Sequence, residues 1–194
     1  MKIENAERKL QEARFFLDKM IEQESMAFED KAKFDFYHSG FLSAGMSVRD
    51  AFHVEQDRKL NEAIKAWKKV WEARLTPDEA CLWDFMREDR KQEVHGSGSS
   101  RTVKTEQIKV GVGSVHSDRS GTVAAIGSRW AGPVVIYKPT YNITIAGTGR
   151  KATEVCGEYL ALLERMVAAF KADRRMRRMI LLRVAHDTGQ TPAA

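Results

Sequence analysis

Apolar residues recur every three or four positions along most of the chain, which is the spacing of amphipathic α-helices. The pattern predicts a first helix over residues 4–24, a second over 26–54, a third over 56–73 and a long last helix over 151–186. Ser25 stands where a cap of the second helix is expected. Because each predicted helix has one apolar face, the helices are expected to pack around a common core.

The second predicted helix interleaves aromatic residues with very small ones, including Phe34, Tyr37, Gly40, Phe41 and Gly45. Small side chains let a neighbouring helix approach closely, so this helix is expected to be the packing centre of the bundle. Its histidines, His38 and His53, have no second potential ligand three or four positions away. We therefore expect them to be packed or surface side chains and not metal ligands.

The fourth predicted helix has the clearest start and end in the sequence. Thr76 is the expected N-cap, Pro77 fits the first helical position, and Glu79 completes a capping box. The helix is expected to end at His95, because Gly96 accepts the left-handed conformation of a C-terminal cap.

After this helix the pattern changes from helical to strand-like. A glycine- and serine-rich linker over residues 96–100 precedes segments in which β-branched and apolar residues dominate. We expect strands within residues 107–115, 122–126, 134–137 and 141–146, joined by hairpin-sized turns and closed by 147–149. They predict a small antiparallel sheet of three or four strands.

The predicted fold is therefore mainly α, of the α+β kind: an up-and-down helical bundle with a small antiparallel β-sheet inserted before the last helix. We expect a helical bundle over residues 1–96, a β-rich insertion over 97–149, a C-terminal helix packing on the bundle over 150–187, and a disordered tail over 188–194.

The composition is that of a soluble protein with a real core, since 43% of the 194 residues are hydrophobic and 30% are charged. No apolar run approaches the roughly 20 residues of a transmembrane helix, and the N-terminus lacks the apolar stretch of a secretory signal. The two cysteines form neither a metal-binding nor a disulfide pattern. We therefore expect a cytoplasmic protein without a membrane partner.

Positive charge is concentrated in the last predicted helix, although the formal net charge of the chain is only +5. The basic residues of this cluster are Lys171, Arg174, Arg175, Arg177 and Arg178, with Arg183 beyond. Such a cluster is a candidate contact for the phosphate backbone of RNA. The alternative is an ordinary solubilising helix surface.

The candidates for chemistry are Arg90 and His95, because arginine is a permanent cation and histidine titrates near neutral pH. Residues five apart on an ideal helix point about 140° away from each other. The pair can share one site only if the last turn unwinds or if a second copy of the chain completes it. The alternative is a solvated, charged helix end. No zinc-protease, phosphate-loop or nucleophile-elbow motif occurs in the sequence, and no metal or cofactor is expected.

The order of these features resembles the HEPN family, the small helical domains of prokaryotic toxin, defence and RNA-processing systems. That family carries an arginine and a histidine separated by four to six residues, and the matching segment here is Arg90-Lys91-Gln92-Glu93-Val94-His95. The second predicted helix is also similar, over residues 36–48, where aromatic residues alternate with Ser, Ala and Gly. The resemblance covers residues 1–96 and, loosely, the last helix, whereas the β-rich insertion has no counterpart in the common domain.

The resemblance implies metal-independent RNA cleavage at the interface of a homodimer. His95 would act as general base on a ribose 2′-hydroxyl or as acid on the leaving 5′-oxygen, while Arg90 would bind the phosphate and the charge of the transition state. Lys91 and Arg87 are the next candidates for phosphate contacts. Glu88 is a candidate to orient the imidazole, and the alternative is an ordinary surface charge. A nucleotidyltransferase-type antitoxin is the partner that a toxin context would supply.

One departure from the family pattern supports other hypotheses. Active members usually carry Asn, Asp or His after the arginine, whereas this chain has Lys91, which cannot accept hydrogen bonds. A second hypothesis is therefore a non-catalytic HEPN-like module that binds nucleotides, RNA or a partner protein. A third, from a different class, is a helical interaction protein with no role in nucleic-acid binding.

Overall fold

The computed structural model describes residues 3–26, 30–52, 57–95, 101–110 and 134–180. In chain order its elements are α1 (Ile3–Ser25), α2 (Lys31–Asp50), α3 (Arg58–Glu72), α4 (Pro77–His95), β1 (Arg101–Val110), β2 (Val134–Ile145), β3 (Thr148–Lys151) and α5 (Ala152–Ala172). Residues 174–180 form one further short helix. The prediction of a mainly helical fold with a small antiparallel sheet is confirmed.

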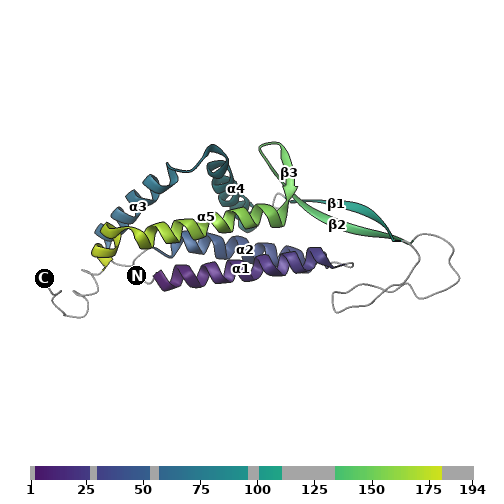
Figure 1. The fold of residues 1–194 in the computed structure, drawn as a ribbon, viewed down its shortest axis with the longest axis horizontal. Coiled ribbons are helices and arrows are strands. Elements are labelled where there is room, and N and C mark those ends of the chain that lie inside the picture. The colour runs from purple at the N-terminus through teal and green to yellow at the C-terminus, as the bar shows by residue number, and fades with distance from the viewer. Residues whose placement is uncertain (1–2, 27–29, 53–56, 96–100, 111–133, 181–194) are drawn as a thin grey trace.

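Helices α1, α2 and α5 lie side by side, while α3 and α4 cover α5 on the side away from α1 (Figure 1). The β1–β2 hairpin projects from the end of the bundle at which α5 begins. Every helix in the described part of the chain is too short or too polar to cross a membrane.

The close approach of α1 and α5 to α2 depends on two glycines of α2. A Cβ added at Gly40 would lie 2.6 Å from the ring of Phe16 in α1, and one added at Gly45 would lie 2.9 Å from the ring of Tyr159 in α5. Neither neighbour could sit where it does beside a larger side chain. This confirms that the small residues of α2 serve helix packing.

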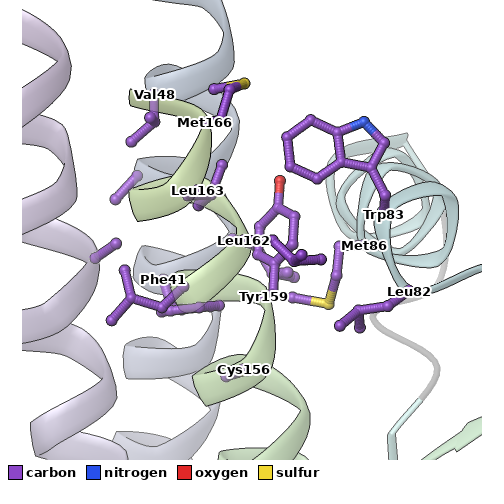
Figure 2. Packing of buried hydrophobic residues seen from close by; sticks show 14 of the residues in the cluster. Phe41, Val48, Leu82, Trp83, Met86, Cys156, Tyr159, Leu162, Leu163 and Met166 are labelled. Carbon is purple, nitrogen blue, oxygen red and sulfur yellow. The ribbon is translucent and has the colours of Figure 1, made fainter. Parts of the chain in front are cut away.

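Tyr159 stands at the centre of the core between α2, α4 and α5. Figure 2 shows its ring pointing from α5 towards Trp83 and Met86 of α4. The ring centre of Tyr159 lies 5.6 Å from that of Trp83 and 6.3 Å from that of Phe41 in α2. Burial raises the pKa of the Tyr159 hydroxyl to about 12. The apolar stripe predicted for the last helix is buried throughout, at Val155, Tyr159, Leu162, Leu163, Met166, Val167 and Phe170.

The described strands form one antiparallel sheet in the order β1-β2-β3. Residues 101–110 of β1 pair with 143–134 of β2, and Ile145 of β2 pairs with Thr148 of β3. Ala146 and Gly147 between them have φ angles of 49° and 83°, as a type I′ hairpin turn requires. Of residues 147–149, expected only to close the strands, Gly147 lies in the turn, and Thr148 and Gly149 begin the strand β3.

The separate strands expected at 134–137 and 141–146 are a single strand, β2, and the prediction of a break was wrong. Pro139 lies inside β2 and pairs with Thr105 of β1. Since β3 pairs only with residues 142–145, β2 has one neighbour at this point, and the missing N–H of proline can face the unpaired side.

The start of the second helix also differs from the prediction. Ser25 is the last residue of α1, and its hydroxyl donates to the carbonyl of Glu22. The N-cap of α2 is Asp30, whose carboxylate accepts from the amides of Ala32 and Lys33 at 3.0 and 3.3 Å. Asp30 thus binds two amides at the start of α2 that have no partner within the helix.

The long last helix expected over 151–186 is interrupted at Asp173. This residue is extended, with ψ of 111°, and its carboxylate accepts from the amide of Met176 at 3.0 Å. Asp173 therefore ends α5 and caps the short helix 174–180. Several predictions lie outside the described residues: the linker 96–100, the strand at 122–126, His53, residues 181–186 of the last helix and the tail 188–194.

Candidate functional site

Arg90 and His95 lie on one uninterrupted helix, α4. The predicted capping box is present at its start, where the Thr76 amide donates to Glu79 Oε2 at 2.9 Å and the Glu79 amide donates to Thr76 Oγ1 at 3.3 Å. Glu79 also accepts from Arg165 of α5 at 2.7 Å, and the hydrogen bond from this arginine holds the pKa of Glu79 at about 2. The beginning of α4 is thus fixed to α5.

The helical backbone of α4 continues through His95, so the last turn does not unwind. Five residues at 1.5 Å and about 100° each place the two positions about 7.5 Å apart along the axis and about 140° apart around it. Of the two ways for the pair to share a site, unwinding of the last turn within a single chain is thereby removed. The side chain of His95 lies outside the described part of the structure.

Arg90 is half-buried. Among the described residues, no carboxylate or other acceptor binds its guanidinium. A guanidinium placed in this way can bind an anionic ligand without first breaking an ion pair.

The further candidates Arg87, Glu88 and Lys91 form a charge cluster on the exposed side of α4. Glu88 pairs with Lys91 at 2.8 Å and with Arg87 at 3.4 Å, and Arg87 also pairs with Asp84 at 3.1 Å. The hydrogen bond from Lys91 and, to a lesser degree, the one from Arg87 lower the pKa of Glu88. Arg87 and Lys91 are therefore partly neutralised by acidic neighbours, unlike Arg90.

The basic cluster divides into one paired and four unpaired side chains. Lys171 pairs with Glu7 of α1 at 2.5 Å. The other four are exposed and have no acidic partner within the described residues: Arg174, Arg175, Arg177 and Arg178. They lie on the short helix 174–180, which buried Met176 attaches to the bundle. Four exposed, uncompensated arginines on two turns form a basic surface that can attract an anionic partner.

The structure does not bring the basic cluster and the Arg90–His95 motif together. The motif end of α4 lies near Cys156, at the beginning of α5, since the charge of Asp89 acts on this cysteine. The arginines follow the other end of α5, at Ala172 (Figure 1). At 1.5 Å per residue, these positions are about 24 Å apart along the helix.

Sequence reasoning missed a buried polar cluster behind the motif. His38 of α2 and Asp89 of α4 are both fully buried side chains, with Nε2 and Oδ2 4.0 Å apart. Burial and the charge of Arg101 hold the pKa of His38 well below its usual range, so the imidazole is neutral at pH 7. One signal was present in the sequence: Asp89 follows Leu82 and Met86 by seven and three positions, on the apolar face of α4.

Arg101, the first residue of β1, belongs to the same cluster. Its side chain is 11% exposed, and its Nη1 lies 3.1 Å from Oδ1 of Asp35 in α2. Burial raises the pKa of the nearby Cys156 thiol, on which the charges of Asp89 and Arg101 act in opposite directions. Within the described residues, no group of three or more His, Cys, Asp or Glu side chains is placed to hold a metal ion.

No family model matches the chain, and no curated protein or solved structure matches it either. The resemblance to the HEPN family therefore stays a prediction, which depends on the motif residues and on the helices that carry them.

Proposed function

We propose that the protein is a HEPN-like, metal-independent endoribonuclease that acts as a homodimer in the cytoplasm. The observation that carries the proposal is the placement of half-buried Arg90, without an acidic partner among the described residues, on a helix that continues unbroken to His95. Because the two positions diverge by about 140°, a complete site takes residues from two copies.

In the proposed reaction, His95 of one copy removes the proton from a ribose 2′-hydroxyl, and the oxygen attacks the adjacent phosphorus. The bond to the 5′-oxygen breaks, and His95 of the second copy supplies the proton to this leaving group. A 2′,3′-cyclic phosphate and a free 5′-hydroxyl result. Arg90 binds the non-bridging oxygens and stabilises the charge that develops on them.

The four exposed arginines at 174–178 would bind the RNA backbone away from the cleaved bond. In a toxin–antitoxin or defence context, a nucleotidyltransferase-type antitoxin would control this activity. Because the proposed reaction uses only the side chains of His95 and Arg90, the enzyme would need no cofactor.

Incubation of the purified chain with RNA in EDTA tests the proposal. We expect cleavage that leaves 2′,3′-cyclic phosphate ends and that is abolished by His95→Ala and by Arg90→Ala. Arg58→Ala is the matched control, because Arg58 is an exposed arginine of α3 that pairs only with Glu62 among the described residues. An inactive wild-type protein, or cleavage that survives His95→Ala, would contradict the proposal.

A second candidate function is a non-catalytic HEPN-like module that binds RNA, nucleotides or a partner protein. The ion pair of Lys91 with Glu88 favours it, because the residue after the arginine is then occupied with a neighbour on its own helix. RNA binding without turnover, weakened by Arg174→Glu, would distinguish this function from the first.

A further inference from the structure

Three exposed lysines of α3 have no ion-pair partner among the described residues. They are Lys59, Lys65 and Lys69. The acidic residues of this helix are occupied by arginines. Glu62 pairs with Arg58 at 2.9 Å. Glu72 pairs with Arg49 at 3.6 Å. The surface of α3 therefore keeps three uncompensated positive charges.

The positions of these lysines are unfavourable for the helix itself. Lys65 and Lys69 are four residues apart, and like charges at this spacing repel each other on one face of a helix. Lys59 lies in the first turn, which contains no acidic residue, beside the positive end of the helix dipole. An anionic ligand would relieve both repulsions.

Lysines of α1 and α2, by contrast, pair with nearby acidic residues. Lys19 pairs with Glu22 at 2.5 Å, and Lys31 pairs with Asp35 at 2.6 Å. Such pairs keep a helix surface polar without leaving a net charge on it. The unpaired lysines of α3 are therefore a concentration of charge that solubility alone does not require.

The first half of α3 lies at the same end of the bundle as helix 174–180. Trp71, in the last turn of α3, contacts Trp83 of α4 with ring centres 5.1 Å apart. Trp67, one turn earlier, contacts Phe170 near the end of α5 with ring centres 4.9 Å apart. α3 thus runs from the end of α5 to α4, and its first turns lie towards the short helix (Figure 1).

We infer that the exposed lysines of α3 and the four arginines of helix 174–180 form one surface for the sugar-phosphate backbone of single-stranded RNA. Ammonium and guanidinium groups bind phosphates of any sequence and release the counterions condensed around them. The inference rests on the proposed function for the arginines, whose RNA binding it extends to α3. It does not require cleavage at Arg90 and His95.

α3 leaves little apolar surface for an anionic lipid bilayer. A helix that binds a membrane surface inserts its apolar side chains between the lipids. In α3 these side chains are buried in the core, at Leu60, Ile64 and Trp71. Val70 is the large apolar residue that α3 exposes, at 53%. A polyanion that is bound without insertion fits this surface, as nucleic acid is.

The test measures the affinity for a single-stranded RNA of about 20 nucleotides at several salt concentrations. Its riboses carry 2′-O-methyl groups, so no 2′-hydroxyl can attack and the ligand stays intact. In Lys59→Glu with Lys65→Glu, the slope of log affinity against log salt should become shallower by about 1.4, which is about 0.7 for each phosphate released. Glutamate in the first turn favours the helix, so the fold should survive. Lys65→Gln with Lys69→Gln is the second variant, with the same expected change.

Lys19→Glu with Lys31→Glu is the matched control. It changes the net charge by the same amount as Lys59→Glu with Lys65→Glu, but both lysines are paired and lie at the opposite end of the bundle (Figure 1). Its slope should stay close to that of the wild type. Equal slopes for the control and both α3 variants would show that affinity follows net charge alone, and would overturn the inference.

Two further outcomes would also overturn the inference. In the first, Arg174→Glu with Arg177→Glu lowers the slope while both α3 variants leave it unchanged, so that RNA contacts the short helix alone. In the second, the wild type binds phosphatidylglycerol vesicles and not RNA. RNA binding that weakens in both segments, by a protein that does not cleave unmodified RNA, would support the surface and refute the proposed ribonuclease activity alone.

Discussion

The guanidinium of Arg49 in α2 stacks on the ring of Trp83 in α4, with its carbon 4.2 Å from the ring centre. Glu72 of α3 completes the arrangement: it accepts from the Trp83 indole at 3.0 Å and pairs with Arg49 at 3.6 Å. Only 12% of the Arg49 side chain is exposed, so water does little to weaken these interactions. Three helices meet at this point, which secures the motif-bearing helix to the bundle.

Arg49→Lys should lower the free energy of unfolding by about 1–2 kcal/mol, because lysine loses the planar stacking on Trp83 and places its charge differently against Glu72. Urea denaturation followed by circular dichroism measures the change. Arg58→Lys is the control: its side chain is 92% exposed and pairs only with Glu62 among the described residues, so the change should stay within about 0.5 kcal/mol. Equal effects of the two variants would contradict the assigned role of Arg49.

Two helical glycines should respond to alanine in opposite directions. A methyl at Gly45 would lie 2.9 Å from the buried ring of Tyr159, whereas one at Gly157 would find its nearest neighbour, Leu17, at 4.0 Å. Overpacking costs about 1–3 kcal/mol and the gain in helix propensity is about 1 kcal/mol. We expect Gly45→Ala to destabilise the protein and Gly157→Ala to stabilise it by up to about 1 kcal/mol. Thermal unfolding of both variants tests this, and a stabilising Gly45→Ala would show that Tyr159 can move.

The helices could be predicted from the sequence because each is defined locally. A stripe of apolar residues with a period of 3.6 identifies α1 to α5, and Thr76 and Glu79 mark the start of α4 with hydrogen bonds between residues three apart. The break at Asp173 escaped prediction, because the apolar pattern continues across it and Met176 remains buried. The extended backbone of Asp173 and the hydrogen bond from the Met176 amide to its carboxylate show that a new helix begins.

The candidate site could be predicted in part, because Arg90 and His95 lie only five positions apart and their spacing is visible in the sequence. The contacts of Asp89 with His38 and of Arg101 with Asp35 join segments far apart in the chain, and no local pattern specifies such pairs. A buried aspartate on the apolar face of α4 indicates that a partner exists, but the identity of the partner follows only from the tertiary fold.

The ion pair of Glu79 with Arg165 should make stability depend on pH in the acid range. The pKa of Glu79 in the folded protein is about 2, below the ordinary value of 4.5, chiefly because Arg165 donates to its carboxylate. A depressed pKa stabilises the fold above the unfolded value, and this contribution is lost as pH falls from about 4.5 towards 2. The difference in Tm between wild type and Glu79→Gln should therefore be full at pH 7 and shrink through this window.

Arg165→Gln provides the control for this pH dependence. Without the arginine, the carboxyl of Glu79 loses the largest cause of its low pKa, while the capping bond from the Thr76 amide is kept. The NMR titration midpoint of Glu79 should then move up towards its ordinary value. A midpoint that does not move would assign the shift to the capping box instead.

The separation between the motif and the arginines of 174–178 predicts that their contribution depends on substrate length. About 24 Å along α5 exceeds the reach of a dinucleotide, whereas a strand of about 20 nucleotides, with phosphates about 3.4 Å apart along a helical axis, spans it. If the proposed ribonuclease activity holds, the double variant Arg174→Glu with Arg177→Glu should raise KM for the long RNA and leave dinucleotide cleavage unchanged.

Salt dependence makes the same prediction quantitative. The slope of log affinity against log salt concentration should become shallower by about 0.7 for each phosphate of a single strand that the variant no longer neutralises. Lys171→Gln is the matched control, because Lys171 already pairs with Glu7 at 2.5 Å and has less charge to offer to RNA. Its slope should stay close to that of the wild type. A double variant whose slope and KM equal those of the wild type would show that these arginines only solubilise the helix, and that RNA is held elsewhere on the molecule.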